Sequence, residues 1–313
     1  MEIKPFTAPS SDGIHTLAGK VYLPSNDPDT PPRGIFHIVH GMTEHIARYD
    51  TFMQTMAADG WLVCGYDHLG HGYTARDTSE LGYIAPKDGW KRLVDDVRIF
   101  SDAVRNTYGR NLPYVLMGHS MGSFIVRLAT ERCVTPDRLI IMGTGGPNPA
   151  AGAGLALIGL IKTFRGDHHI SSLIDAVAFG SYNDRFGGKS PDADPHAWLT
   201  TDVSVRDRYR VDPFCTFKFT VSAMGDLIHL TKYANRGKWY TSIPKRLPVL
   251  LVAGEDDPVG NYGKGVRTVH DRLTRAGIPT ACHLYPGARH EILNDTCRDD
   301  VLRDIRTFLE DIE

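Results

Sequence analysis

The stretch Tyr114-Val-Leu-Met-Gly-His-Ser-Met-Gly122 joins an apolar run to a serine that is flanked by glycines. The run is typical of a buried strand, and the apolar spacing between Phe124 and Ala129 predicts a helix directly after it. Gly118 and Gly122 stand two places on either side of Ser120 and let neighbouring backbone pass close to a sharp turn. We therefore expect Ser120 to lie exposed above the edge of a sheet.

Apolar runs alternate with amphipathic segments along most of the chain, which is typical of a mainly parallel sheet covered by helices. The fold class is therefore α/β. We predict strands at 17–23, 34–39, 62–66, 114–118, 139–143, 249–254 and 280–285. We predict helices at 49–58, 90–104, 266–276 and 301–312.

The alternation stops after Gly143 and resumes near Val249. The residues between them form irregular helical stretches rich in Asp, His, Arg and aromatic side chains. Because a structureless loop of about 100 residues is improbable in a folded domain, we expect a small helical subdomain here. We assign residues 147–247 to this cap and residues 1–146 and 248–313 to the core.

Composition excludes several classes of function. The formal net charge is −2, with 42% hydrophobic and 23% charged residues, so no basic field is present to attract nucleic acid. The start of the chain does not read as a secretory signal, and the longest apolar stretch, residues 150–161, is shorter than the ~20 residues that span a bilayer. The five cysteines are widely spaced without a CxxC pair, so we expect reduced thiols in a cytoplasmic protein.

A serine hydroxyl needs a base to take its proton and an acid to orient that base. His290 follows one predicted strand, and the run Glu255-Asp256-Asp257 follows another. Because the carboxyl ends of parallel strands converge on one crevice, these side chains are expected to meet Ser120. We favour Asp257 as the acid, with Asp256 as the alternative.

Attack by Ser120 on a carbonyl would also require hydrogen-bond donors for the oxyanion. We expect one donor to be the amide of Met121, at the start of the helix, and the other to be the amide of Met42, in the loop after the strand at 34–39. His119 adjoins Ser120 but should not be the base, because adjacent side chains on a sharp turn point apart. Its imidazole is expected to brace neighbouring loops.

The fourteen histidines call for a test of metal binding. His68 and His71, together with Asp67, have residue types that ligate metals. However, the sequence has no HExxH motif and no Cys-His spacing of a zinc site. We expect neither a catalytic metal nor a cofactor.

With these residues placed, the chain resembles the α/β-hydrolase superfamily, and in particular its monoacylglycerol lipase and lysophospholipase branch (serine aminopeptidase S33-type, Hydrolase_4). The resemblance covers nearly the whole chain. It rests on His40-Gly-Met-Thr-Glu-His45 with Arg48-Tyr49, Asp67-His-Leu-Gly-His-Gly72, Gly118-His-Ser-Met-Gly122, Gly254-Glu-Asp-Asp257, Gly287-Ala-Arg-His290, and, for the cap, Ser181-Tyr-Asn-Asp-Arg-Phe186 with Trp198-Leu-Thr-Thr-Asp202.

The resemblance implies an eight-stranded, mostly parallel sheet with helices on both faces and an inserted helical cap. It also implies that Ser120, Asp257 and His290 are the catalytic triad and that Met42 and Met121 supply the oxyanion hole. The expected activity is hydrolysis of monoacylglycerols, lysophospholipids or similar medium-sized acyl esters. The apolar stretch 154–161 then forms either a lip for acyl chains and transient membrane contact, or a cap helix packed on the core.

Two alternatives remain open. A peptidase resembling proline iminopeptidase would need cap carboxylates to bind the substrate ammonium group. The candidates are Asp167, Asp175, Asp184, Asp192, Asp194, Asp202 and Asp207. A non-catalytic binder with a hydrolase fold is the other alternative, although such proteins often lack a triad residue and none is missing here. Dehalogenase or epoxide hydrolase chemistry would require a carboxylate in place of Ser120.

Overall fold

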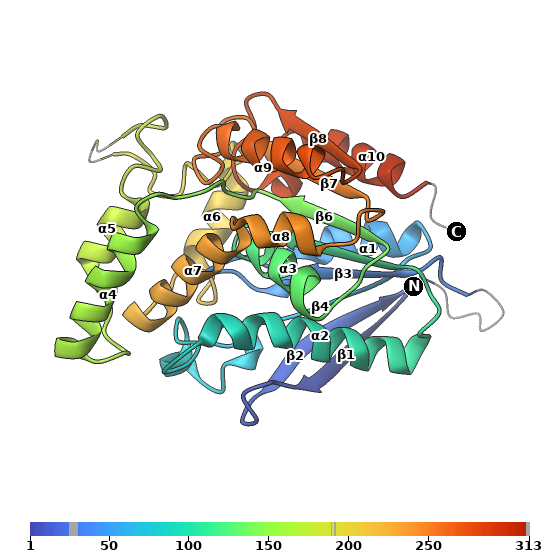
Figure 1. Cartoon of the computed structure of the whole chain (residues 1–313), viewed down its shortest axis with the longest axis horizontal. Helices are drawn as coiled ribbons and strands as arrows, with labels where there is room; N and C mark the ends of the chain where they lie inside the picture. Colours follow the sequence, from blue (N-terminus) through green and yellow to red (C-terminus); the bar gives the residue numbers. More distant parts are fainter. Residues whose placement is uncertain (25–30, 189, 191, 311–313) are drawn as a thin grey trace.

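The central feature of the computed structural model is an eight-stranded sheet in the order β1-β2-β4-β3-β5-β6-β7-β8 (Figure 1). The structure describes residues 1–24, 31–188, 190 and 192–310. Strand β2 runs antiparallel to β1 and β4, and the other neighbouring pairs are parallel. The strands are β1 Glu2–Pro9, β2 Thr16–Leu23, β3 Ile35–Val39, β4 Leu62–Tyr66, β5 Tyr114–His119, β6 Arg138–Met142, β7 Val249–Gly254 and β8 Thr280–Tyr285.

Alternate side chains of the central strands pack into two apolar cores, one on each face of the sheet. On one face they pack with helices α2 (Gly89–Tyr108), α3 (Met121–Arg132) and α9 (Lys264–Arg275). On the other face they pack with α1 (Asp50–Ala58) and α10 (Arg298–Phe308). The central strands are therefore buried on both sides, which is why they read as continuous apolar runs.

Among the described residues between β6 and β7, where the alternation is interrupted, the structure has five helices. They are α4 Ala151–Arg165, α5 Ser172–Phe179, α6 Val203–Val211, α7 Val221–Ala234 and α8 Gly237–Ser242. Helices α4 and α5 lie at one end of the molecule, away from the sheet (Figure 1). Helices α7 and α8 instead pack on α3 and share its apolar core.

The expected mostly parallel sheet with helices on both faces is confirmed. Each of the seven predicted strands is present within one residue of its expected ends, and the four predicted helices are present as α1, α2, α9 and α10. The last predicted helix ends earlier than expected, at Phe308, and Ile312 lies outside the described residues. Strand β1 was not predicted, because it is an edge strand that contains Pro5 and buries little except Ala8.

Among the described residues, no helix combines the length and the apolar character needed to cross a bilayer.

Candidate active site

The turn between β5 and α3 holds Ser120 in a left-handed backbone conformation, with φ 53° and ψ −119°. This conformation costs a non-glycine residue about 1–3 kcal/mol, so its surroundings must enforce it. A Cβ atom on Gly122 would lie 2.0 Å from the carbonyl oxygen of Val39, and one on Gly118 would lie 2.3 Å from that of Gly122. Only glycine fits at both positions, because the backbone of β5, α3 and the loop after β3 is in contact there.

His290 and Asp257 form a buried pair. His290 Nδ1 lies 2.9 Å from Asp257 Oδ2, and the other oxygen of Asp257 accepts a hydrogen bond from the amide of Val259 at 2.8 Å. Asp257 is fully buried and His290 is 2% exposed, whereas the alternative acid Asp256 is only partly buried. The structure therefore places Asp257, not Asp256, against the imidazole of His290.

Four of the five predicted site residues line one cavity of about 790 Å³, and the fifth, Asp257, is buried against His290. The cavity lies at the carboxyl ends of the parallel strands, with Met42 after β3, Ser120 after β5, Val259 after β7 and His290 after β8. Met121, at the start of α3, lines the same cavity. A single crevice thus holds the serine, the histidine and both residues expected to donate amides to an oxyanion.

The walls of this cavity are mainly apolar and come largely from the segment between β6 and β7. They include Phe124, Phe179, Leu199, Phe217, Phe219 and Leu227. A cavity of this volume and character accepts a small molecule with a substantial apolar portion.

His119 braces the loops around Ser120. Its Nδ1 lies 2.9 Å from the hydroxyl of Tyr49 and 3.0 Å from a carboxylate oxygen of Glu44, and its Nε2 lies 3.3 Å from the carbonyl of His290. Burial acts to lower the pKa of His119, but the Glu44 carboxylate outweighs it and raises that pKa above its usual value. Both ring nitrogens are thus engaged away from the serine, which supports a bracing role rather than that of the base.

A buried ion cluster joins the loop of Met42 to the loop of His290, and our sequence interpretation did not assign it. Arg48 donates to both carboxylate oxygens of Glu291, at 2.6 and 2.7 Å, and to Glu44 at 3.3 Å. Burial opposes ionisation of Glu44, yet His119 and Arg48 hold its pKa below the usual value. The spacing of Glu44 and Arg48 by four residues was a local signal, but the link to Glu291 spans 243 residues.

The segment after α5 contacts the histidine loop directly. The carbonyls of Trp198 and Leu199 accept hydrogen bonds from the amides of His290 and Glu291, at 3.4 and 2.7 Å. The Trp198 ring also lies against the His290 imidazole, with 5.2 Å between ring centroids. The orientation of His290 therefore depends on this segment as well as on Asp257.

The residues tested for metal binding have other partners. His68 Nε2 lies 3.1 Å from the carbonyl of His40, and His71 Nδ1 lies 3.0 Å from that of Leu69. Burial lowers the pKa of His68 to about 3 and that of His71 to about 4, so both are neutral at pH 7. Asp67 accepts hydrogen bonds from two backbone amides. These side chains organise loop backbone beside the cavity.

Comparison with known proteins identifies the family. The family model of Hydrolase_4, described as serine aminopeptidase, S33, matches residues 30–297, which is most of the chain. The chain belongs to this family. The resemblance noted in the sequence is thereby confirmed at the level of the Hydrolase_4 family.

Full-length relatives of this Hydrolase_4 member are named as lipases and esterases. A monoacylglycerol lipase of Mycolicibacterium smegmatis is 29% identical over 96% of this chain and 98% of its own length. The solved structure of a carboxyl esterase from Bacillus coagulans, in complex with glycerol, has a TM-score of 0.90 at 30% identity and covers 100% and 99% of the two chains. A phospholipase of Bacillus subtilis, YtpA, is 22% identical over 89% and 96%. The protein is a hydrolase of the esterase and lipase type with an α/β-hydrolase fold.

The contacts of Gly122 predict that Gly122→Ala disrupts the turn at Ser120. The added methyl group overlaps the backbone of β3, so we expect a loss of about 1–3 kcal/mol in the free energy of unfolding, and loss of ester turnover. Urea denaturation and an esterase assay measure the two effects.

Gly152→Ala is the matched control, because a Cβ on Gly152 of α4 meets no heavy atom within 4 Å. It should keep full activity and gain slightly in stability, since alanine favours a helix. A Gly122→Ala protein as stable and active as Gly152→Ala would contradict the close approach of β3 and α3.

Proposed function

We propose that the protein hydrolyses carboxylic esters through an acyl-enzyme on Ser120. His290 is the general base, Asp257 orients and stabilises its imidazole, and the amides of Met42 and Met121 donate to the oxyanion. The observation that carries this proposal is the buried His290–Asp257 pair, in which His290 lines the same cavity as Ser120.

In this mechanism, Ser120 Oγ attacks the ester carbonyl carbon while His290 Nε2 takes the hydroxyl proton. The carbonyl oxygen becomes an oxyanion, and its collapse expels the alcohol, which receives the proton from His290. Water then attacks the acyl-enzyme with His290 again as base. The second collapse releases the carboxylic acid and returns the proton to Ser120.

We propose that the substrates are monoacylglycerols, lysophospholipids or other medium-sized acyl esters. The mainly apolar cavity wall suits an acyl chain, and the full-length relatives are named as a monoacylglycerol lipase, a carboxyl esterase and a phospholipase. The relatives differ in head group, so the shared feature that they support is the acyl ester.

The carboxylates of the cavity argue against the peptidase alternative. Glu44, Asp175 and Glu291 are the acidic side chains that line it, among the described residues. Glu44 and Glu291 are paired with Arg48, and Asp175 is paired with Lys218 at 3.0 Å. Since each is already paired with a cation, none offers an unpaired charge for a substrate ammonium group.

An assay that compares an aminoacyl-proline substrate with acyl esters tests this argument. Turnover of the aminoacyl-proline substrate in preference to acyl esters would favour the peptidase instead.

We propose that residues 147–247 act as a cap on the core. Helix α5 supplies Ala176 and Phe179 to the cavity wall, which supports this role. The packing of α7 and α8 on α3 provides the attachment to the core.

We also propose a cytoplasmic location, because the five cysteines are free thiols.

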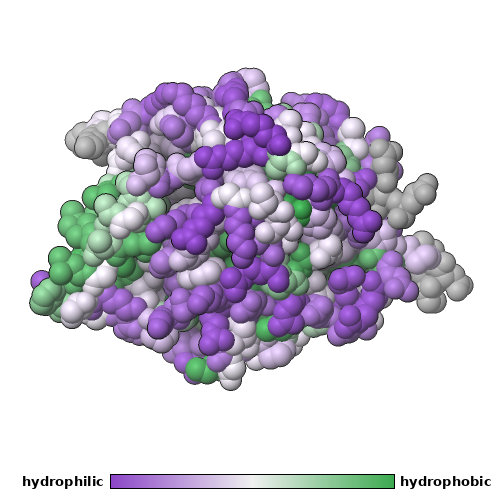
Figure 2. Space-filling model, in the orientation of Figure 1, coloured by the Kyte–Doolittle hydropathy of each residue, from purple (hydrophilic) through white to green (hydrophobic). Residues whose placement is uncertain are grey.

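An exposed apolar patch adjoins the cavity and supports transient contact with a lipid surface. It consists of Leu160, Phe164, Ile170, Leu173 and Val177, each at least half exposed. Figure 2 shows the patch at the end of the molecule formed by α4 and α5. Helix α5 contributes to both the patch and the cavity wall, so a lipid seated on the patch lies next to the cavity.

Ser120→Ala tests the proposed nucleophile. We expect ester turnover to fall by at least ~10³-fold and labelling by a fluorophosphonate probe to disappear. An assay across acyl chain lengths and head groups, run with both proteins, would define the substrate. Equal labelling of both proteins would refute the acyl-enzyme, and a wild-type protein that turns over no ester would favour the non-catalytic binder.

Asp257→Asn and Asp256→Asn form a matched pair for the acid. The asparagine side chain at position 257 carries no negative charge and cannot stabilise the imidazolium of His290, so kcat is expected to fall by about 10³–10⁴-fold. Asp256 is only partly buried, so its replacement by asparagine should leave kcat nearly unchanged. A larger loss at 256 than at 257 would overturn the assignment.

Vesicle binding tests the apolar patch. The double variant Phe164→Ser/Val177→Ser removes two largely exposed apolar side chains and should bind phosphatidylcholine vesicles at least ~10-fold more weakly in a sedimentation assay. Val203→Ser/Val211→Ser, on α6, changes two similarly exposed side chains and serves as the control. Equal binding of the two double variants would contradict the proposed contact, whereas turnover of a short soluble ester should be unchanged in both.

A further inference from the structure

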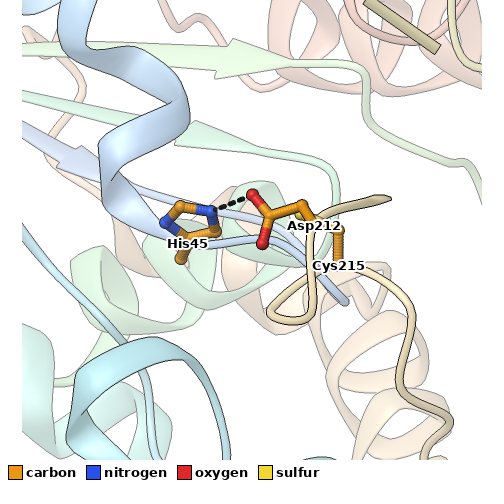
Figure 3. Close-up of side chains that lie close together, drawn as sticks. All are labelled: His45, Asp212 and Cys215. Atoms are coloured by element: carbon orange, nitrogen blue, oxygen red, sulfur yellow. Dashed lines mark hydrogen bonds and ion pairs between the residues drawn. The ribbon is translucent and has the colours of Figure 1, made fainter. Parts of the chain in front are cut away.

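Three side chains with different metal-binding donor atoms meet beside the cavity, and the proposed mechanism uses none of them. They are His45, in the loop after β3, and Asp212 and Cys215, in the segment that follows α6 (Figure 3). His45 Nε2 lies 2.9 Å from Asp212 Oδ2, and ligand atoms of all three residues lie within 4.8 Å of one another. Within the described part of the chain, these three side chains form the group of His, Cys, Asp or Glu residues whose donor atoms are close enough to share a metal ion.

The local packing orients the donor atoms. Phe214 packs against the His45 ring, with 5.7 Å between centroids, and its amide donates to the second carboxylate oxygen of Asp212 at 2.9 Å. Cys215 is 2% exposed and lines the cavity, whereas the Asp212 side chain is 29% exposed. An ion can therefore reach the group from solvent past Asp212 or from the cavity past Cys215.

The surrounding charges favour a cation. Besides Asp212, the charges that act on the Cys215 thiol are those of Arg48, Glu44 and Glu291. Glu44 and Glu291 are paired with Arg48 and His119, so the carboxylate that can pair with a cation at this group is Asp212. The Asp212 carboxylate and a Cys215 thiolate together would balance the charge of a divalent cation bound to His45, Asp212 and Cys215.

We propose that His45, Asp212 and Cys215 bind a zinc-like divalent cation. Imidazole nitrogen, carboxylate oxygen and thiolate sulfur are the ligands of tetrahedral Zn²⁺ sites, and three protein ligands leave the fourth position for water. Mg²⁺ and Ca²⁺ prefer oxygen ligands alone and would bind poorly. On binding, the Cys215 thiol loses its proton to solvent as the sulfur–metal bond forms. The ion ties the loop after β3 to the segment after α6 and requires no contribution from Ser120.

Titration of the chelator-treated, full-length protein with Zn²⁺, in competition with a chromogenic chelator, measures the site. We expect one tight site, weakened at least ~10-fold in Cys215→Ser and in His45→Gln. Cys282→Ser, which changes a partly buried free thiol elsewhere, should bind as wild type. Ser120→Ala should also bind as wild type, so failure of the proposed ester hydrolysis would leave this result intact.

Substitution with Co²⁺ provides a readout that does not depend on how stable the variants are. Ligation by Cys215 should give the wild-type Co²⁺ complex a thiolate-to-metal charge-transfer band, and Mg²⁺ should not displace the ion. A wild-type Co²⁺ complex without that band would overturn the proposal. Equal Zn²⁺ affinity in wild type and Cys215→Ser would overturn it as well.

Discussion

The close approach of backbone at Gly118 and Gly122 determines how the rest of the site is built. With no Cβ at these positions, β5 and α3 contact the loop after β3, and Ser120 is forced into a left-handed conformation between them. The turn therefore stores strain that the sheet must resist. Six neighbouring parallel strands, with β5 among them, provide that rigidity, and their carboxyl ends bring Met42, Ser120 and His290 to the crevice.

Buried charge provides a second level of organisation around the serine. Arg48 binds two carboxylates from loops that follow different strands, and His119 links one of these carboxylates to the backbone of His290. Removing one member of such a cluster leaves an uncompensated buried charge, which costs more than the loss of a surface ion pair. The loops that carry Met42 and His290 are thus held relative to one another by interactions that do not take part in the chemistry.

Much of the core could be predicted from the sequence, because its strands are apolar on both faces and its helices have a regular apolar spacing. Ser120, Asp257 and His290 could be chosen because each follows an apolar strand, and the structure places Ser120 and His290 on one cavity and Asp257 against His290. Their catalytic roles stay predictions. The edge strand β1 lacks this pattern, since a single neighbour and partial exposure leave few constraints on its side chains.

The contacts that the sequence did not reveal join distant parts of the chain. The Arg48–Glu291 pair and the group of His45, Asp212 and Cys215 depend on how loops fold over the sheet, and no local periodicity reports that. The helices between β6 and β7 gave only irregular apolar spacing, because α4 and α5 bury few of their side chains.

The backbone hydrogen bonds from His290 and Glu291 to Trp198 and Leu199 have a consequence for how a substrate enters. Movement of this part of the wall would break these hydrogen bonds and shift the backbone of His290, the proposed base. Helices α4 and α5, at the far end from the sheet, have no such tie to the histidine loop among the described residues. The apolar end of the molecule therefore offers the proposed acyl chain an approach that leaves these hydrogen bonds intact.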